Sequence, residues 1–65
     1  MKKELLTPEE QTFLSQMIVH HDMAVKMSKK MLLSVDSHDV ESLCYSIIQN
    51  QVNEIALMKQ MLRGA

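Results

Sequence analysis

Hydrophobic residues recur every three or four positions along two stretches of the chain, which is the period of an amphipathic α-helix. The first stretch collects on one side Phe13, Leu14, Met17, Ile18, His21, Ala24, Val25, Ser28, Met31 and Leu32. The second collects Val40, Leu43, Cys44, Ile47, Ile48, Gln51, Ile55, Met58 and Leu62, with Glu54 and Met61 at one margin of that stripe. Stripes this broad are typical of bundle helices rather than of a narrow coiled-coil seam.

The first helix has a clear start signal. Thr7 can cap it, Pro8 suits the first helical position, and Glu10 can bond back to the backbone of the cap. No glycine or proline interrupts the apolar period after that point. We therefore expect this helix over residues 8–33.

A second start signal follows a short polar segment. Asp36 or Ser37 can cap a helix there, and we expect that helix over residues 37–63, with Gly64 as a C-terminal cap. Two helices joined by a turn of a few residues pack as antiparallel neighbours. The fold class is therefore predicted to be all-α, with residues 1–65 forming a single helical hairpin.

The length of the chain predicts a partner. A chain of 65 residues is below the size at which one core usually suffices, and its single cysteine, Cys44, cannot close an internal disulfide. No cysteine and histidine cluster of the zinc-domain type is present. We expect two hairpins to close a four-helix bundle as a homodimer.

Charge and hydropathy exclude two kinds of partner. The net charge is −1, acidic and basic residues are interspersed, and only two aromatic residues are present, which argues against nucleic acid. No apolar run is long enough to span a bilayer, and the first ten residues lack the apolar core of a signal peptide. We expect a cytoplasmic protein without a membrane partner, or a periplasmic one if the natural chain carries a leader.

Polar residues interrupt both apolar stripes. His21 lies near the centre of the first and Gln51 near the centre of the second, and each is fifteen positions from Asp36 in the expected turn. Glu54 follows one helical turn later, within reach of the imidazole, and a carboxylate in the interior needs a proton, a histidine or a metal. A dimer would duplicate this layer, and bundles build metal sites in such layers. A hydrogen bond from His21 to Gln51 or Glu54 would equally satisfy the ring without a metal.

A second cluster lies along one margin of the first stripe. His20, Met23, Met27 and Met31 follow one another at three- and four-residue spacing, so their side chains line up along the helix. Met61 of the second predicted helix lies on a comparable margin. Imidazole and thioether groups form a soft ligand set that suits Cu(I). Methionine is also a common filler of bundle cores and dimer contacts, so packing is the competing interpretation.

These motifs resemble a widespread bacterial family known as domain of unknown function 305, which has a ferritin-like helical fold. The resemblance rests on two motifs, Phe13-Leu14-x-x-Met17-Ile18-x-His20-His21-x-x-Ala24-Val25-x-Met27-Ser28 and Ile47-Ile48-x-x-Gln51-x-x-Glu54-Ile55-x-x-Met58. Some members are periplasmic copper-binding proteins. The resemblance implies a helical bundle and the binding of copper or a related metal through His20, His21, Met17, Met23 and Met27.

Three functions follow as hypotheses. The first is a metal-binding protein for copper storage or homeostasis, with candidate ligands His20, His21, Met17, Met23, Met27, Glu54 and Gln51. The second is a metal-free structural or interaction dimer whose polar layer fixes helix register. The third, a ferritin-type di-iron oxidase, is disfavoured because such sites need several inward carboxylates and Glu54 is the only candidate. We therefore expect a protein that is not an enzyme.

Overall fold

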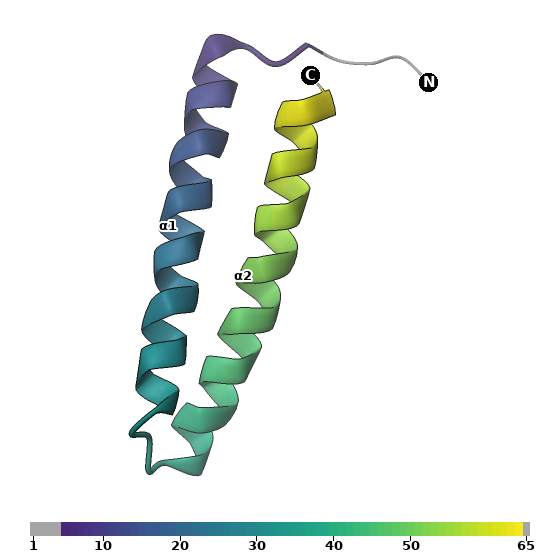
Figure 1. Cartoon of the computed structure of the whole chain (residues 1–65). Helices are drawn as coiled ribbons and strands as arrows, with labels where there is room; N and C mark the ends of the chain where they lie inside the picture. Colours follow the sequence, from purple (N-terminus) through teal and green to yellow (C-terminus); the bar gives the residue numbers. More distant parts are fainter. Residues whose placement is uncertain (1–4, 65) are drawn as a thin grey trace.

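The computed structural model describes residues 5–64, which form two antiparallel α-helices joined by a short turn (Figure 1). Helix α1 spans Pro8–Leu32 and helix α2 spans His38–Gly64. No strand occurs within residues 5–64, so the predicted all-α hairpin is confirmed. The first four residues, which contribute to the prediction about a signal peptide, lie outside the described part of the chain, as does Ala65.

Helix α1 begins with the predicted capping box. The backbone N–H of Glu10 donates to the Thr7 hydroxyl at 3.1 Å, and the N–H of Thr7 donates to the Glu10 carboxylate at 2.9 Å. Both bonds satisfy amides that have no partner within the helix. At the other end the Leu33 N–H donates to the Lys30 carbonyl at 3.1 Å, a tightened final turn. The helix therefore ends at Leu32, one residue before the predicted boundary.

Helix α2 is capped by Ser37, one of the two predicted candidates. The Ser37 hydroxyl accepts the N–H of Val40 at 3.2 Å, so the helix begins at His38 rather than at the cap residue itself. The prediction that Gly64 caps the C-terminus was wrong, because Gly64 is the last helical residue. No residue from 5 to 64 has a positive φ, so the left-handed cap that favours glycine does not form there.

The buried residues form one narrow seam between the two helices. They are Leu14, Val25 and Ser28 from α1 and Cys44 and Met58 from α2. Within each helix, inward positions recur at alternating steps of three and four, as in a coiled-coil seam. The broad stripes predicted from the sequence are thus only partly buried. Each helix has a single neighbour, which covers one seam and leaves the rest of the stripe exposed.

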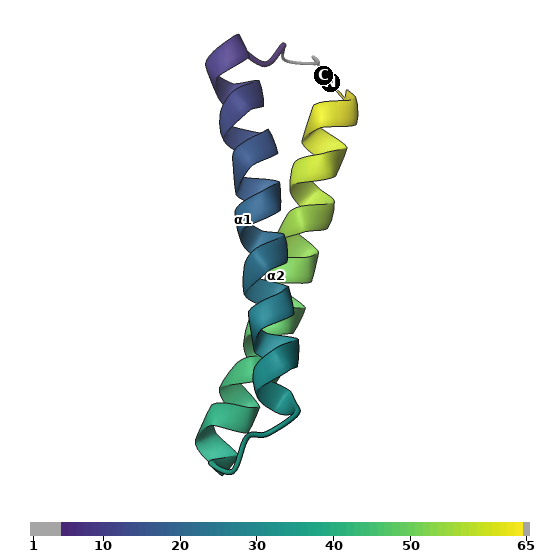
Figure 2. The same cartoon turned by 60° about the vertical axis from the view of Figure 1, so that its left-hand side comes forward.

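Small side chains occupy the seam near the turn. Ser28 and Cys44 are both buried, with 6% and 5% of their surface exposed, and Cys44 is a free thiol. The two helices lie closer together at the turn than at their free ends in Figure 1, and they cross in the turned view of Figure 2. Close approach near the turn is consistent with small residues, and the bulkier Leu14 and Met58 fill the seam at the open end.

The hairpin is long and one helix thick. Its Cα atoms extend 48 × 22 × 13 Å, with a radius of gyration of 15.0 Å, whereas a compact chain of this length has about 11 Å. In the part of the chain described here, neither helix is long and apolar enough to cross a membrane. The elongated shape leaves a large share of each helix without any packing partner.

Candidate metal site at mid-length of the hairpin

His21 and Glu54 join the two helices. Nε2 of His21 lies 2.6 Å from Oε1 of Glu54, and the two residues are 33 positions apart in the chain. The His21 side chain is 12% exposed, which confirms that the ring points inward. The Glu54 side chain is 57% exposed, so its carboxylate lies at the margin of the seam and not in the interior. Glu54 reaches the ring from the margin of α2, and water solvates the rest of its carboxylate.

The second ring nitrogen of His21 has no partner. Nδ1 is buried and makes no hydrogen bond among the described residues. If the ring were doubly protonated, this atom would be a buried N–H without an acceptor, which is costly. The neutral ring that donates Nε2–H to Glu54 avoids that cost and leaves a free lone pair on Nδ1. A neutral imidazole held by a carboxylate is the form in which histidine serves as a metal ligand.

An open hollow of about 480 Å³ adjoins this contact, towards the free ends of the helices. Its lining residues come from both helices and are Phe13, Leu14, Met17, His21, Glu54, Leu57, Met58 and Met61. Most of the lining is apolar. The hollow therefore places a histidine and a carboxylate at the edge of an apolar depression, a setting in which a few polar groups decide what binds.

Three methionines line the same hollow as His21 and Glu54. Met17 comes from α1, and Met58 and Met61 come from α2. Of these, only Met17 was a predicted ligand. The signal for the other two was present, because residues 54, 58 and 61 recur at the spacing of one helix side. The sequence analysis placed Met61 on a comparable margin of the second helix, and the structure brings that margin beside Met17.

The other predicted ligands do not join this hollow. Met27 lines a separate hollow of about 330 Å³ near the turn, with Lys30, Met31 and Ser34. Met23 is 55% exposed and His20 is also exposed. Gln51 is half-buried in the seam and makes no side-chain hydrogen bond among residues 5–64. The predicted row of His20, Met23, Met27 and Met31 therefore lies outside the hollow beside His21, and Met27 and Met31 share the hollow near the turn.

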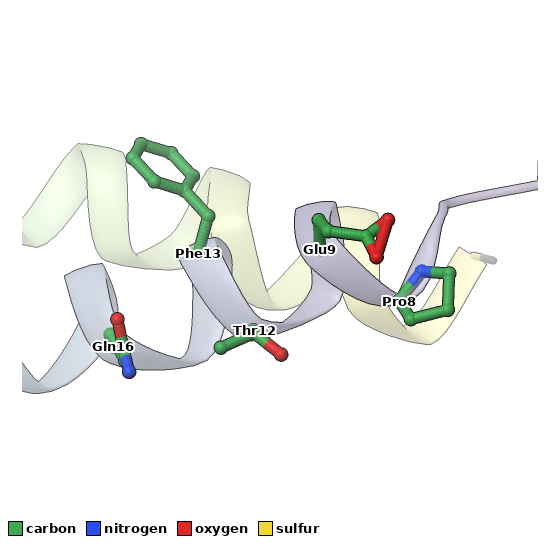
Figure 3. Close-up of a pocket in the computed structure, with 5 residues that line it drawn as sticks. All are labelled: Pro8, Glu9, Thr12, Phe13 and Gln16. Carbon is green, nitrogen blue, oxygen red and sulfur yellow. The ribbon is translucent and has the colours of Figure 1, made fainter.

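Side chains of the classical metal-binding types are sparse. Within the described residues, no group of three or more histidine, cysteine, aspartate or glutamate side chains is close enough to hold one ion. A hollow of about 340 Å³ on the first turns of α1 offers only Glu9 as a charged group (Figure 3). The hollow beside His21 is therefore the best candidate, and its donors are one imidazole, one carboxylate and three thioethers.

Comparison with known proteins identifies the family of the chain but no individual relative. A family model described as a domain of unknown function, DUF305, matches residues 2–62, nearly the whole chain. No curated protein matches, and no solved structure matches. The family assignment agrees with the resemblance seen in the sequence motifs, and it carries no established function.

Proposed function

The chain belongs to the DUF305 family, and we propose that it binds a transition-metal ion, copper in preference, at the hollow where His21 meets Glu54. The observation that carries the proposal is the shared lining of this hollow by one imidazole and three thioethers. Such soft donors favour Cu(I) over harder ions such as Mg²⁺ or Ca²⁺. The role that fits this chemistry is copper storage or buffering.

The residues have separate roles in this proposal. His21 supplies a ring nitrogen, and Met17, Met58 and Met61 supply sulfur. Glu54 holds the ring through Nε2 and fixes its tautomer, as outer carboxylates do for metal-binding histidines. Because more than half of the Glu54 side chain is exposed, it is also free to turn towards a bound cation.

Equilibrium dialysis against Cu(I), followed by elemental analysis, tests the proposal. We expect the natural chain to retain copper and a His20→Ala/His21→Ala variant to lose most of it. A His20→Ala single variant separates the two histidines, since His20 does not line the hollow. Equal retention by the natural chain and the double variant would remove the metal-binding proposal.

We further propose that two hairpins close a four-helix, ferritin-like bundle as a homodimer. The support is the small seam: four hydrophobic residues are buried, and no described side chain has less than 2% of its surface exposed. A chain this small rarely folds stably on so little core.

A metal-free dimerisation module is the second candidate function. It is favoured by the 2.6 Å contact itself, which satisfies one nitrogen of His21 without any metal. A polar contact across a seam can fix helix register at some cost in stability. This candidate predicts that copper leaves the melting temperature unchanged, whereas an ion bound only by the folded state raises it.

We propose no enzymatic role. Ferritin-type di-iron sites draw glutamates from several helices, whereas Glu54 is the only carboxylate that lines the hollow. An oxygen-uptake assay with ferrous iron checks this point, and turnover above the buffer rate would contradict it.

A further inference from the structure

One side of the hairpin carries exposed apolar side chains along its whole length. We call it the methionine face, and its main members are the exposed Phe13, Met27, Leu43, Leu57 and Met61 and the half-buried Met17. Within each helix these positions are separated by combinations of three- and four-residue steps, which keeps them on one side. The members near the free ends line one hollow together, so the two helices present this side in the same direction.

A polar band interrupts the methionine face near its middle. It consists of His20, Asn50 and Glu54, which continue the same three- and four-residue spacing. Residue 20 is the central residue of α1, which spans 25 residues, and residue 51 is the centre of α2, which spans 27. The face is therefore apolar, then polar, then apolar when followed from either end.

The opposite side of the hairpin has a different character. It carries Asp22, Lys26 and Lys59, and the Lys26 ammonium pairs with the Asp22 carboxylate at 3.0 Å. None of the six main members of the methionine face is charged, although Lys30 lines the hollow beside Met27. Met27 and Phe13 are 70% and 58% exposed. An exposed surface that is mostly apolar is the side that a partner would cover.

The chain exposes more surface than a folded monomer of the same mass. The chain exposes 5400 Å² at a mass of 7.5 kDa, whereas a folded monomer of that mass exposes about 4,200 Å². The excess of about 1,200 Å² is larger than the area of about 800 Å² that one partner buries in a standard interface. One further contact of ordinary size would therefore remove most of the excess.

We infer that a second copy of this chain covers the methionine face and that the two polar bands lie opposite each other. This inference rests on the proposed homodimer and assigns it a surface and an alignment. A twofold contact requires a surface that matches itself. The apolar and polar segments follow the same order from both ends of the hairpin. Apolar segments therefore face apolar segments, and the polar bands face each other, whether the two hairpins are parallel or antiparallel.

The alignment completes the candidate metal site with residues of the partner copy. It brings a second Glu54 and a second His20 to mid-length of the bundle and covers the open side of the hollow. Two carboxylates enclosed together need a cation or a proton between them. A site with too few donors in one hairpin thereby gains imidazole and carboxylate donors from the second.

Two matched substitutions test the surface. Leu57 on the methionine face is 51% exposed, and Val52 on the opposite side of the same helix is 46% exposed. We expect Leu57→Lys to raise the dissociation constant of the dimer about tenfold or more and Val52→Lys to leave it unchanged. Sedimentation equilibrium in the presence of a chelator measures both, and circular dichroism verifies that both remain helical.

The results separate the two proposals. A dimer that tolerates Leu57→Lys overturns the assigned surface and leaves the homodimer standing, whereas a monomeric natural chain overturns both. Copper binding is measured separately by dialysis and does not enter this test.

The alignment has its own test. A nitroxide label on Asn50→Cys, in a Cys44→Ser background, reports the distance between the two polar bands by pulsed electron resonance. Helices packed about 10 Å apart predict a label separation of about 20 Å. A separation above about 35 Å would show staggered copies and overturn the alignment.

Discussion

His21 and Glu54 make the only polar side-chain contact between α1 and α2 among the described residues, with 2.6 Å between Nε2 and Oε1. The contact lies at mid-length of the hairpin, where a slip of one helix by a single turn would move the partners about 5 Å apart and break it. One interaction therefore links the register of the helices to the orientation of the candidate ligand.

Replacing Glu54 with Gln tests whether the carboxylate acts on the metal. Gln retains an oxygen that accepts the Nε2–H bond but removes the charge. Because the Glu54 side chain is 57% exposed, solvent screens the interaction, and we expect the melting temperature to change by less than about 4 °C. We expect Cu(I) affinity to fall about tenfold or more, measured by competition with a chromophoric chelator.

Asp22→Asn is the matched control for that substitution. Asp22 also belongs to an ion pair, 3.0 Å from Lys26, and its side chain is 51% exposed, but it does not line the hollow. We expect Asp22→Asn to leave Cu(I) affinity unchanged. An equal loss in both variants would show that net charge, rather than the contact with His21, determines the affinity.

The thioethers of the hollow give a second prediction. Replacing Met17 and Met61 together with Leu removes two sulfur atoms at nearly constant volume, so stability should change by less than about 1.5 kcal/mol. We expect Cu(I) affinity to fall by about tenfold or more, because the nitrogen ligand loses its soft partners. Met23→Leu, at an exposed position, should have no effect on affinity. Equal affinity in all three proteins would exclude sulfur ligation at this hollow.

The sequence predicted the hairpin because its signals are local. The capping box at Thr7 and the helical period of the apolar residues each depend on neighbours within a few positions, and both were confirmed. The sequence predicted that Asp36 or Ser37 caps α2, and in the structure the cap is Ser37. Gly64 was misassigned because a glycine near a helix end can also be the last helical residue.

The candidate site could be predicted only in part. The inward ring of His21 follows from its central position in the stripe, and the reach of Glu54 follows from the hairpin geometry. Met58 was not a predicted ligand, and Met61 was placed only at a margin of its stripe, because the helical period does not determine which margins of two packed helices lie on the same side. The exposure of Glu54 agrees with its place at a margin of the second stripe, since one neighbouring helix covers only the seam.

The two helix caps give a prediction about stability. The Thr7 hydroxyl accepts the N–H of Glu10 and the Ser37 hydroxyl accepts the N–H of Val40, so Thr7→Ala and Ser37→Ala each remove one bond and should both destabilise the protein. Loss of a cap costs about 1 kcal/mol, and we expect Thr7→Ala to reach at least that value. Urea unfolding at one fixed protein concentration measures both variants. Thr12→Ala, on the exposed surface of α1, serves as the control, and a smaller effect for Thr7 than for Thr12 would contradict the role of the box.

Replacing His21 with Leu distinguishes the two proposed functions. If His21 is a metal ligand, its ring lowers the stability of the apo protein because it is polar and lies in an apolar seam. If His21 fixes the register of the helices, its contact with Glu54 raises stability. Leu removes the buried Nδ1 that has no partner, and Glu54 remains solvated because it is mostly exposed. We expect His21→Leu to abolish Cu(I) binding and to raise stability by about 1 kcal/mol, or roughly 5 °C in melting temperature.

Gln51→Leu is the control for this last substitution, because Gln51 occupies the same seam and makes no side-chain hydrogen bond among the described residues. It should also raise the melting temperature at equal protein concentration, but Cu(I) binding should persist because Gln51 does not line the hollow. A melting temperature that falls by several degrees in His21→Leu and rises in Gln51→Leu would identify the contact with Glu54 as a structural bond. That result would favour the metal-free dimerisation module, since the histidine would then be retained for the register of the helices.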